Sequence, residues 1–502
     1  MSDLDAVREE RWTPPPGTLG LVLELRTHLE AAAVKYCHFK SNDMLARSAT
    51  GENDLDLLVD RRDAQRLHLV MSRLGFRRAI APGGREHPGV SHHYALDTDS
   101  GRFVHVHLHF TLTIGDDASK NFRLPIEAAY LDSTRTDEIL PVPSEEFELA
   151  VFVVRMMLKH ASIDALLTGK AQLGANELRE LRWLRERADA VGTNAVVAEH
   201  LGGIGVDLWS TCLASLESNP GVIARLLLGR RMIRALRPHA RRRASVDLVV
   251  RFMRKASWAG QRYVLRRPTR KRLERAGALI AIVGGDGAGK STAVEGAAEW
   301  LGSVFVVHQT HLGKPPHSLL TLAVKGPMYV GRRFGLLSST AAVVDPRTAV
   351  PSDFPGTAWA LWHALTARDR LKAYRKARRV ADRGGLVVSD RWPLPNLHLM
   401  DGVRTDWILD RGDAPSRVAA RLARWERSMY AHIAPPDVLL VLRLDPEVAV
   451  RRRDDEPPDY VRARNTEVFE ADWSTTHALV IDAEQPAEEV LAHVRHAIWE
   501  RL

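Results

Sequence analysis

The stretch that most constrains the fold of this chain is AIVGGDGAGKST, residues 281–292, which fits the pattern G-x-x-x-x-G-K-[ST]. An apolar run from Ala278 to Val283 precedes the glycines, and the helix-forming sequence STAVEGAAEWL follows them. A buried strand, a glycine-rich turn and a helix in this order form a loop that binds phosphate groups. From residue 276 onward, strand-like apolar runs alternate with helical ones, which predicts a parallel sheet with helices on both faces.

Each residue type in the loop has a physical reason to be there. Glycines allow backbone N–H groups to turn inward on a phosphate, the lysine carries positive charge to the β- and γ-phosphates, and the serine hydroxyl can ligate Mg²⁺. The alternative is a glycine-rich turn without a ligand. We predict a site for ATP and Mg²⁺ with these ATP-binding residues: Gly284, Gly285, Asp286, Gly287, Ala288, Gly289, Lys290, Ser291 and Thr292. Within it, Lys290 is the predicted catalytic residue and Ser291 a predicted Mg²⁺ ligand.

The loop also contains a carboxylate, Asp286, although loops of this kind hold anions. Backbone N–H groups face the phosphates, whereas a side chain on the outer turn can project toward a metal ion or a hydroxyl group. On chemistry alone, a hydrogen-bonding or metal-organising role fits a carboxylate in this position.

A second motif, GGLVVSDRW, ends an apolar run at Asp390 and Arg391. The carboxyl end of a parallel strand lies beside the phosphate loop in such sheets, so Asp390 can organise Mg²⁺ and its waters. Arg391 can clamp a phosphate or stabilise charge on a transferring phosphoryl group. We predict both residues to be catalytic. The alternative is a simple surface ion pair between the two.

Four motifs together resemble those of the thymidylate kinase family. In chain order they are GGDGAGKST, LTARDR (365–370), VVSDRW (387–392) and PPDVLLVLRLDPEVAVRRR (435–453). The resemblance covers about residues 275–502. It implies a three-layer α/β fold, ATP with Mg²⁺ as the phosphoryl donor, and a nucleoside monophosphate as the acceptor.

The resemblance also implies roles for single residues. Asp286 would face the acceptor, Arg370 would help to hold it, and Arg391 belongs to the Asp-Arg pair of the family. Asn396 stands at the spacing of an acceptor-contacting polar residue. The acceptor-binding residues implied in this way are Asp286, Arg370, Arg391 and Asn396.

Arginines follow DPEVAV where the family has its lid. On a closing lid, arginines reach the phosphates only when the site shuts, so they exclude water and complete the charge clamp. Arg453 is the lid residue that we predict to be catalytic, although the sequence leaves the choice open among Arg452, Arg453, Arg462 and Arg464.

The sequence departs from the family at the positions that hold the thymine ring of the acceptor. The aromatic positions of the family hold Thr366 and Leu399, and Pro393 and Pro395 enter a segment that the family keeps helical. We therefore expect an acceptor other than thymidylate: another nucleotide, a sugar, or a different small hydroxyl or phosphate compound.

Near the N-terminus, the stretch ENDLDLLVD places Asp54 and Asp56 on one face of a strand, about 7 Å apart at their Cα atoms. Two such carboxylates can share divalent metal ions. With HFKSN upstream and VHVHLHF downstream, the stretch resembles the nucleotidyltransferase superfamily over about residues 20–130. Ser41 stands where that superfamily has glycine, and histidines replace its third acid, so His107 could serve the metal site. The alternative is a degenerate or structural domain.

The net charge of +9 is concentrated, because residues 225–275 contain eighteen Lys or Arg against two acids. Apolar residues recur there at helical spacing. The segment is either a solvated helical connector or a surface for nucleic acid or an anionic membrane.

We expect a mixed α/β protein with three parts, at residues 18–143 (nucleotidyltransferase-like, α+β), 144–275 (helical basic connector) and 276–502 (thymidylate kinase-like, with a parallel sheet). Without a signal sequence or an apolar span, we expect a cytoplasmic protein. A homodimer is compatible with the sequence. The favoured function is an ATP-dependent phosphotransferase acting on a small-molecule acceptor. The alternatives are a bifunctional nucleotidyltransferase-kinase, or an ATP-binding protein that docks through its basic helices.

Overall fold

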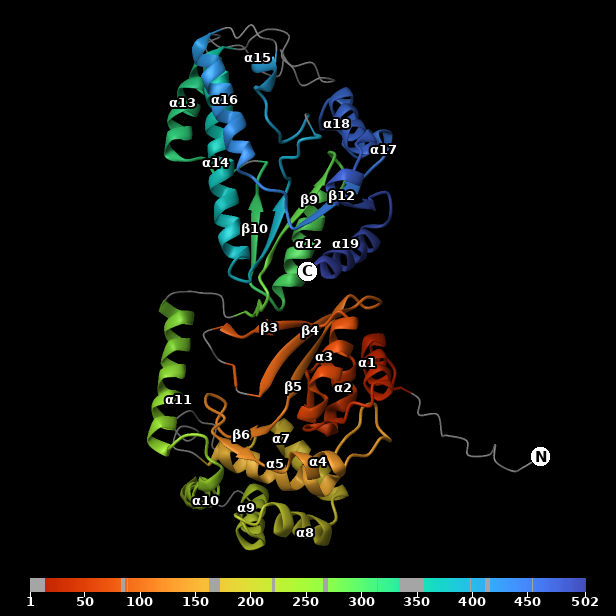
Figure 1. The fold of residues 1–502 in the computed structure, drawn as a ribbon, viewed down its shortest axis with the longest axis vertical. Helices are drawn as coiled ribbons and strands as arrows, with labels where there is room; N and C mark the ends of the chain where they lie inside the picture. Colours follow the sequence, from red (N-terminus) through yellow and green to blue (C-terminus); the bar gives the residue numbers. More distant parts are fainter. Residues whose placement is uncertain are drawn as a thin grey trace, which may run out of the picture. The chain divides into compact units, whose positions relative to one another are not determined.

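The computed structural model describes residues 14–502 except 83–85, 88, 162–171, 219–221, 265–269, 314, 334–355, 398, 411–415 and 454. The chain divides into two compact units, Met1–Thr269 and Arg270–Leu502 (Figure 1). The boundary expected near residue 275 falls close to this division, whereas the boundary expected at 143/144 lies inside the first unit. A mobile loop predicted at 343–357 lies almost entirely outside the described residues.

The first unit contains a mixed sheet with the strand order β1-β2-β5-β4-β3. Its strands are β1 (Tyr36–His38), β2 (Leu55–Val59), β5 (Arg102–His109), β4 (Val90–Asp97) and β3 (Arg77–Ile80). β2 and β5 run parallel, while the other neighbours are antiparallel. The smaller elements of this part are α1 (Gly20–Ala31), α2 (Leu45–Ala49), α3 (Ala64–Arg73), β6 (Leu112–Ile114), β7 (Phe122–Leu124) and α4 (Glu127–Asp132).

The two faces of β2 and β5 differ in chemistry because side chains alternate along a strand. Leu55 and Leu57 of β2, with Val106 of β5, are buried in a core that includes residues of α1 and α3. On the other face, Asp56 of β2 lies opposite His107 of β5, and buried Leu58 lies opposite His109. One face of the sheet thus holds the core, and the other carries acids and histidines.

The rest of the first unit is helical. Its helices are α5 (Glu145–His160), α7 (Ala175–Arg187), α8 (Ala190–His200), α9 (Val206–Ser218), α10 (Val222–Ala235) and α11 (Ala244–Ala259). Neighbours α7, α8, α9 and α10 all contact α5. This explains why α5 is apolar nearly all round, with a fully buried run that includes Val151, Phe152 and Val153.

The second unit contains the predicted parallel sheet, with the strand order β10-β11-β9-β12-β13. Its strands are β10 (Val307–His311), β11 (Leu386–Asp390), β9 (Ala278–Gly284), β12 (Val438–Arg443) and β13 (Leu479–Asp482). β10 begins later than the apolar run at 303–309 indicates. Phe305 forms an isolated parallel bridge with Lys271, which is next to the short strand β8 (Arg272–Leu273). The ladder between β10 and β11 begins at Val307.

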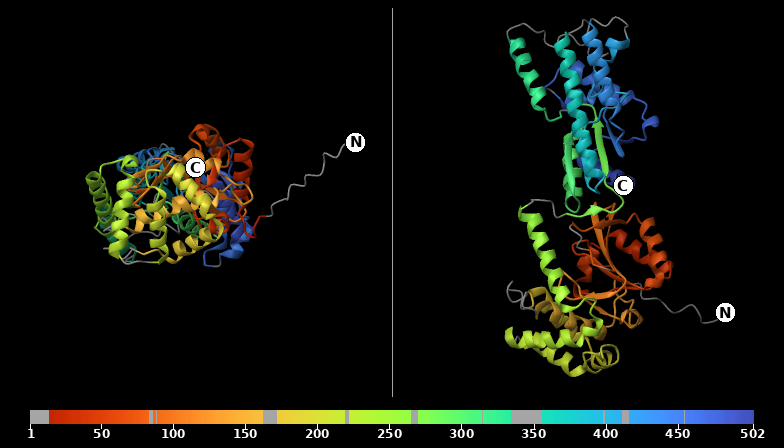
Figure 2. Two further views of the ribbon diagram at one scale, coloured as in Figure 1. Left: turned by 90° about the horizontal axis from the view of Figure 1, so that it is seen from below. Right: turned by 60° about the vertical axis from the view of Figure 1, so that its left-hand side comes forward.

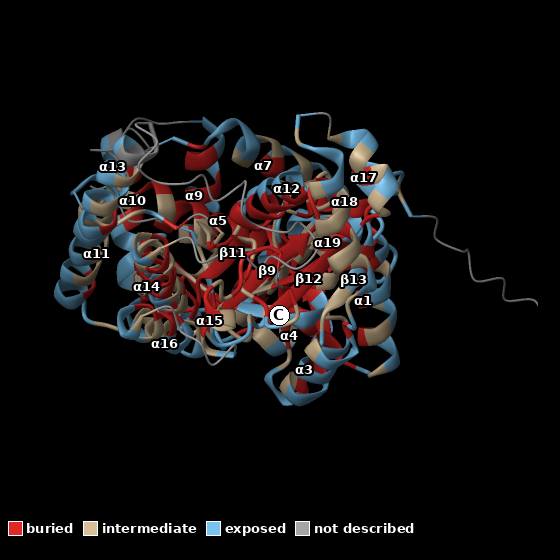
Figure 3. Ribbon diagram, turned by 90° about the horizontal axis from the view of Figure 1, so that it is seen from above, coloured by how far each residue is buried: buried red, intermediate tan, exposed pale blue. Residues whose placement is uncertain are grey.

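Helices cover this sheet. α12 (Lys290–Gly302) and α19 (Ala487–Arg501) contact each other and the sheet. α14 (Thr357–Ala381) contributes Ala377 and Ala381 to the core formed by one face of β9. Figure 3 shows β9, β11 and β12 coloured as buried. The remaining helices are α13 (Leu319–Arg333), α15 (Asp406–Asp410), α16 (Arg417–Ala431), α17 (Pro446–Arg452) and α18 (Pro458–Glu470).

Among the described residues, none of the helices combines the length and the apolar character needed to span a bilayer.

Candidate functional site

The predicted phosphate loop connects the end of β9 to the start of α12. Gly287 and Gly289 both have φ of 80°, in the left-handed region where a side chain is unfavourable. A side chain is also excluded at Gly285, because its Cβ would lie 1.8 Å from Oδ1 of Asn465 in α18. Ser291 and Thr292 are exposed in the first turn of α12. The local geometry therefore requires glycine at these three positions and leaves both hydroxyl groups accessible.

Asp286 lies among three cations. Arg464 Nη1 donates a hydrogen bond of 2.7 Å to Asp286 Oδ2, while Lys290 Nζ lies 3.9 Å and Arg391 Nη2 3.7 Å from Oδ1. Burial acts to raise the pKa of Asp286, but the hydrogen bond from Arg464 and the surrounding positive charges hold it below its ordinary value. The carboxylate is thus the counter-charge of the cations that would meet a phosphate.

Lys290 is almost fully buried, with 8% of its surface exposed. Its ammonium group donates a hydrogen bond to the carbonyl oxygen of Gly285. Burial lowers the pKa of Lys290 to about 8, and the nearby Asp286 carboxylate opposes this shift. Lys290 therefore lies against the backbone of its own loop.

β11 brings Asp390 and Arg391 beside the loop, since Asp390 pairs in register with Ile282 of β9. Asp390 Oδ1 is buried without a hydrogen-bond partner in the described chain, and Oδ2 lies 3.7 Å from His311 Nε2. Arg391 adopts φ of 68°, and its carbonyl oxygen accepts a hydrogen bond from Ser389 Oγ. This unusual backbone conformation directs the guanidinium toward Asp286, at 3.7 Å, and not toward its sequence neighbour.

Arg370 is buried and makes its hydrogen bonds within the protein. Nε donates to Leu312 O, Nη2 donates to Gly313 O at 2.9 Å, and Nη1 donates to Tyr430 Oη and to Asp401 O. Nη2 also lies 3.4 Å from Asp401 Oδ1. The structure thus places Arg370 where it supports the Asp401 loop. Asp401 in turn contacts Arg391 at 3.5 Å.

The side chain of Asn396 has both amide atoms buried and without hydrogen-bond partners among the residues described. Such a group is costly unless a ligand or water satisfies it. Leu399 is buried nearby in sequence, and Pro393 and Pro395 lie in an irregular segment. The hydroxyl of Thr366 donates to Trp362 O within α14.

The predicted lid arginines have different surroundings. Arg464 contacts Asp286 and stacks over the ring of Tyr460 at 4.0 Å. Arg453 pairs with Asp455 and Glu456, both at 3.0 Å, although its side-chain stem lies against Gly287. Arg452 donates to Ala483 O, and Arg462 pairs with Glu447 and Asp459. The structure thus brings Arg464 to the loop carboxylate, a choice that the sequence left open.

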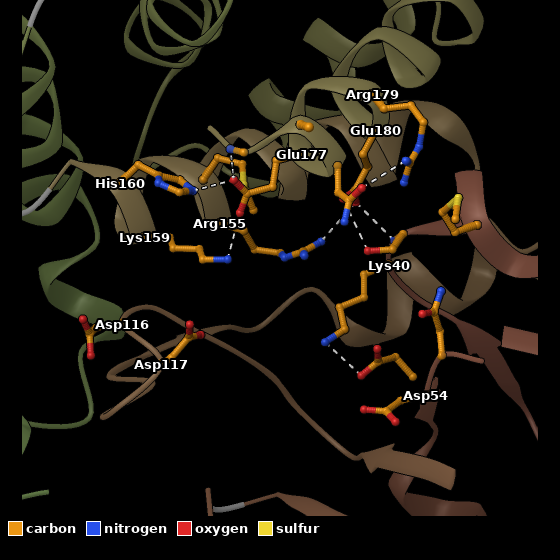
Figure 4. Close-up of a pocket in the computed structure, with 18 of the residues that line it drawn as sticks. Lys40, Asp54, Asp116, Asp117, Arg155, Lys159, His160, Glu177, Arg179 and Glu180 are labelled. Atoms are coloured by element: carbon orange, nitrogen blue, oxygen red, sulfur yellow. Dashed lines mark hydrogen bonds and ion pairs between the residues drawn. The ribbon is translucent and has the colours of Figure 1, made fainter. Parts of the chain in front are cut away.

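In the first unit, a cavity of about 1370 Å³ contains the two predicted metal-binding acids, Asp54 and Asp56 (Figure 4). Lys40 Nζ lies 2.8 Å from Asp56 Oδ1. Burial acts to raise the pKa of Asp56, but Lys40 and the hydrogen bonds from His107 and His109 hold it well below its usual range. Asp56 is therefore an anion at the edge of the cavity.

The opposite wall of this cavity comes from α5 and α7, which sequence analysis did not connect with the acids. Arg155 and Lys159 of α5 and Glu177 and Glu180 of α7 extend toward it. Behind them, burial raises the pKa of Glu148 to about 8, although Asn42 Nδ2 donates to its carboxylate at 2.8 Å. The polar residues interrupting the apolar sequence of α5 are the signal that could have identified this wall.

The basic connector contributes to the same cavity through α11. Arg254 lines it and donates to Ala118 O at 2.9 Å, and Lys255 lies 3.7 Å from Asp116 Oδ2. The outer face of α11 is apolar instead, with Phe252 exposed to 71% and Met253 to 62%. Figure 2 shows this yellow-green helix in two further views. α11 thus directs Arg254 and Lys255 toward the cavity and leaves Phe252 and Met253 in solvent.

By fold and site, the second unit is a parallel α/β unit with a strand–phosphate loop–helix arrangement. No protein-family model matches the chain. It is 28% identical over 232 residues to the "uncharacterized ATP-binding protein YghR" of Escherichia coli K12, across 44% of this chain and 86% of YghR. It is 27% identical over 224 residues to the "uncharacterized ATP-binding protein YghS" of the same strain, across 44% of this chain and 92% of YghS.

Proposed function

We propose that the second unit is an ATP-dependent phosphotransferase, similar to thymidylate kinases, that transfers a phosphoryl group to a small acceptor. The observation that carries the proposal is the convergence of Lys290, Arg391 and the unpartnered carboxylate oxygen of Asp390 at the carboxyl ends of β9 and β11. The names of YghR and YghS support ATP as the nucleotide. The matched length of 232 residues is close to the length of this unit.

The donor set fits Mg²⁺ with ATP. Ser291 has an exposed hydroxyl, and Asp390 Oδ1 lacks a hydrogen-bond partner among the described residues, so both offer the oxygen ligands that Mg²⁺ prefers. The ion would neutralise charge on the phosphates. In this proposal Lys290 leaves the Gly285 carbonyl to contact the phosphates, and Arg391 stabilises the charge of the moving phosphoryl group.

The acceptor side is proposed to include Asp286 and Asn396. Asp286 would accept a hydrogen bond from an acceptor hydroxyl, and the amide of Asn396 would find its missing partners there. Arg464 would hold an anionic group near the loop. Arg370 would position Asp401 and Arg391, since its own donors are directed at protein oxygens.

The direct test incubates the purified chain with ATP labelled at the γ-phosphate, Mg²⁺, and a panel of nucleoside monophosphates, sugars and phosphorylated sugars. We expect label to be transferred to at least one acceptor, with thymidylate among the poor ones. A thymine ring without an aromatic neighbour loses stacking of about 0.5–1.5 kcal/mol beyond burial. Thymidylate as the best acceptor would contradict the pocket assignment, and transfer to none would contradict the kinase proposal.

A second candidate function concerns the first unit, for which we propose binding of a nucleotide with a divalent metal ion. The cavity of about 1370 Å³ supports it, because Asp54, which immediately precedes β2, and Asp56 of β2 face two cations of α5 across it. This would make the protein bifunctional, with a nucleotidyltransferase-like unit.

For this second function we expect Asp56→Asn to weaken metal-dependent nucleotide binding at least tenfold, because it removes the buried carboxylate charge. The measurement is calorimetry on the full chain carrying Lys290→Ala, which silences the phosphate loop. Exposed Asp207→Asn is the matched control. The proposal is contradicted if Asp56→Asn and Asp207→Asn bind nucleotide and metal equally well. It is also contradicted if the Lys290→Ala chain shows no metal-dependent nucleotide binding.

We also propose that α11 docks on an anionic membrane surface. Its outward face is apolar, which favours a lipid interface over nucleic acid. The exposed Arg241 and Arg243 precede the helix and can attract anionic headgroups.

We expect sedimentation with phosphatidylserine-containing vesicles that falls as salt rises, and little with phosphatidylcholine alone. Phe252→Ser with Met253→Ser should reduce vesicle binding several-fold without changing the melting temperature, because both side chains are exposed. Binding to duplex DNA alone, or no loss in the variant, would contradict the lipid assignment.

A further inference from the structure

Three histidines of β4 and β5 meet on the polar face of the first sheet. The antiparallel register sets His92 of β4 opposite His107 of β5, and His105 lies two residues earlier on the same strand. One ring nitrogen from each of the three lies within 4.8 Å of the others. Three imidazoles at this spacing can share one metal ion.

Two of these rings have their Nδ1 atom within hydrogen-bond distance of a carboxylate. His105 Nδ1 lies 2.5 Å from Asp54 Oδ1, and His107 Nδ1 lies 3.2 Å from Asp56 Oδ1. A carboxylate that accepts the N–H of a metal-binding histidine fixes its tautomer and raises the basicity of the other nitrogen. The arrangement therefore leaves the Nε2 atoms of His105 and His107 as the ligand nitrogens.

The positions of these remaining nitrogens fit a metal centre. His105 Nε2 lies 3.2 Å from His92 Nδ1, close to the separation of about 3.3 Å between nitrogens of a tetrahedral zinc site with bonds of about 2.0–2.1 Å. His107 Nε2 is buried and makes no hydrogen bond among the described residues, although Asp54 Oδ2 lies 3.5 Å from it. A metal ion would satisfy this nitrogen and would replace the contact between His92 and His105.

We propose that His92, His105 and His107 bind a divalent transition-metal ion through imidazole nitrogens, with Asp54 and Asp56 as the carboxylates that orient two of the rings. Imidazole ligands suit Zn²⁺, Co²⁺, Ni²⁺ or Cu²⁺, whereas Mg²⁺ prefers oxygen. A cavity of about 320 Å³ is lined by His92 and His107 and gives room for water or a substrate group at a fourth position. The proposal depends on neither nucleotide binding nor phosphotransfer.

A competing set, Asp56 with His107 and His109, also has its ligand atoms within 4.8 Å of one another. We favour the three-histidine set because the Asp56 carboxylate already pairs with Lys40 at 2.8 Å. A metal ion at Asp56 would have to displace that ammonium or lie beside it. The two sets differ in His92 and His109, so variants of these residues distinguish them.

The test titrates the untagged, metal-stripped full chain with Co²⁺, followed by Zn²⁺ competition. We expect a visible absorption band typical of four-coordinate cobalt, displacement by Zn²⁺, and no displacement by Mg²⁺ at the same concentration. His92→Ala should weaken Co²⁺ binding by more than about 100-fold, and Asp54→Asn by about 10–100-fold, the usual range for a supporting carboxylate.

His109→Ala should leave Co²⁺ affinity within about twofold of the parent chain. Exposed His496→Ala in α19 is the control for adventitious surface binding. Melting temperatures of the metal-free variants verify that each one folds. Loss of binding in His109→Ala but not in His92→Ala would place the ion at the competing set and overturn the proposal. Absence of the cobalt band would overturn it too, because the pair at 3.2 Å would then be a hydrogen bond between two rings.

Discussion

Replacing Lys290 by alanine is expected to reduce phosphoryl transfer by at least about 10²–10³-fold and to weaken ATP binding. The lysine is buried in the loop, and in the proposed function its charge meets the phosphates directly. Loss of one preorganised donor to developing charge typically costs about 3–4 kcal/mol in the transition state. The measurements are turnover with the best acceptor of the panel and ATP affinity by calorimetry.

The Lys290→Ala chain should still fold. The ammonium of Lys290 lies 3.9 Å from Asp286 in the parent chain. Arg464 contacts the same carboxylate at 2.7 Å and remains in the variant. Exposed Lys376→Ala in α14 is the matched control, since it removes the same charge elsewhere in the second unit. Unchanged turnover in Lys290→Ala, with the Lys376 control also active, would contradict the phosphotransferase proposal.

The parts of the second unit that could be predicted from sequence are those fixed by local pattern. The loop follows from glycines at positions that need positive φ, and the strand ending at Asp390 follows from its uninterrupted apolar run. The parallel sheet could be predicted because strand-like apolar runs alternate with helical ones after residue 276.

The contacts that complete the candidate site could not be predicted, because they join distant segments. Arg464 reaches Asp286 across 178 positions of sequence, and Arg370 reaches Tyr430 across 60. Asp401 stands in a short turn with no motif around it, yet its carboxylate lies between Arg370 and Arg391. Only the packing of α14, α16 and α18 brings these groups together.

The separate connector expected at 144–275 shows what hydrophobic periodicity does not reveal. Amphipathic periodicity identified its helices, but periodicity does not reveal the partner of a buried face. α5 is enclosed by neighbouring helices, and its Arg155 and Lys159 face Asp54 and Asp56 across one cavity. Arg254 and Lys255 of α11 line the same cavity, so part of the basic segment belongs to this cavity and not to a separate connector.

Substituting Asp286 by asparagine is expected to lower turnover of the acceptor without lowering the affinity for ATP. Turnover with the true acceptor should fall by about 10²-fold, because the amide replaces the charge that would hold an acceptor hydroxyl. ATP affinity should be maintained or increased. Lys290, Arg391 and Arg464 lose their shared counter-charge, so a bound phosphate would neutralise them more favourably.

The same substitution should lower the stability of the chain, and ATP binding should restore it. Removing one partner of a buried ion pair leaves the other charges uncompensated and costs about 3–5 kcal/mol. The melting temperature of Asp286→Asn without ATP should therefore fall below that of the parent, and saturating ATP should raise it by more than it raises the parent. Glu447→Gln, which removes an exposed carboxylate paired with Arg462 in the same unit, is the control. If ATP raises the melting temperature of parent and variant equally, and acceptor turnover is unchanged, Asp286 is neither the counter-charge of the phosphate-binding cations nor part of the acceptor site.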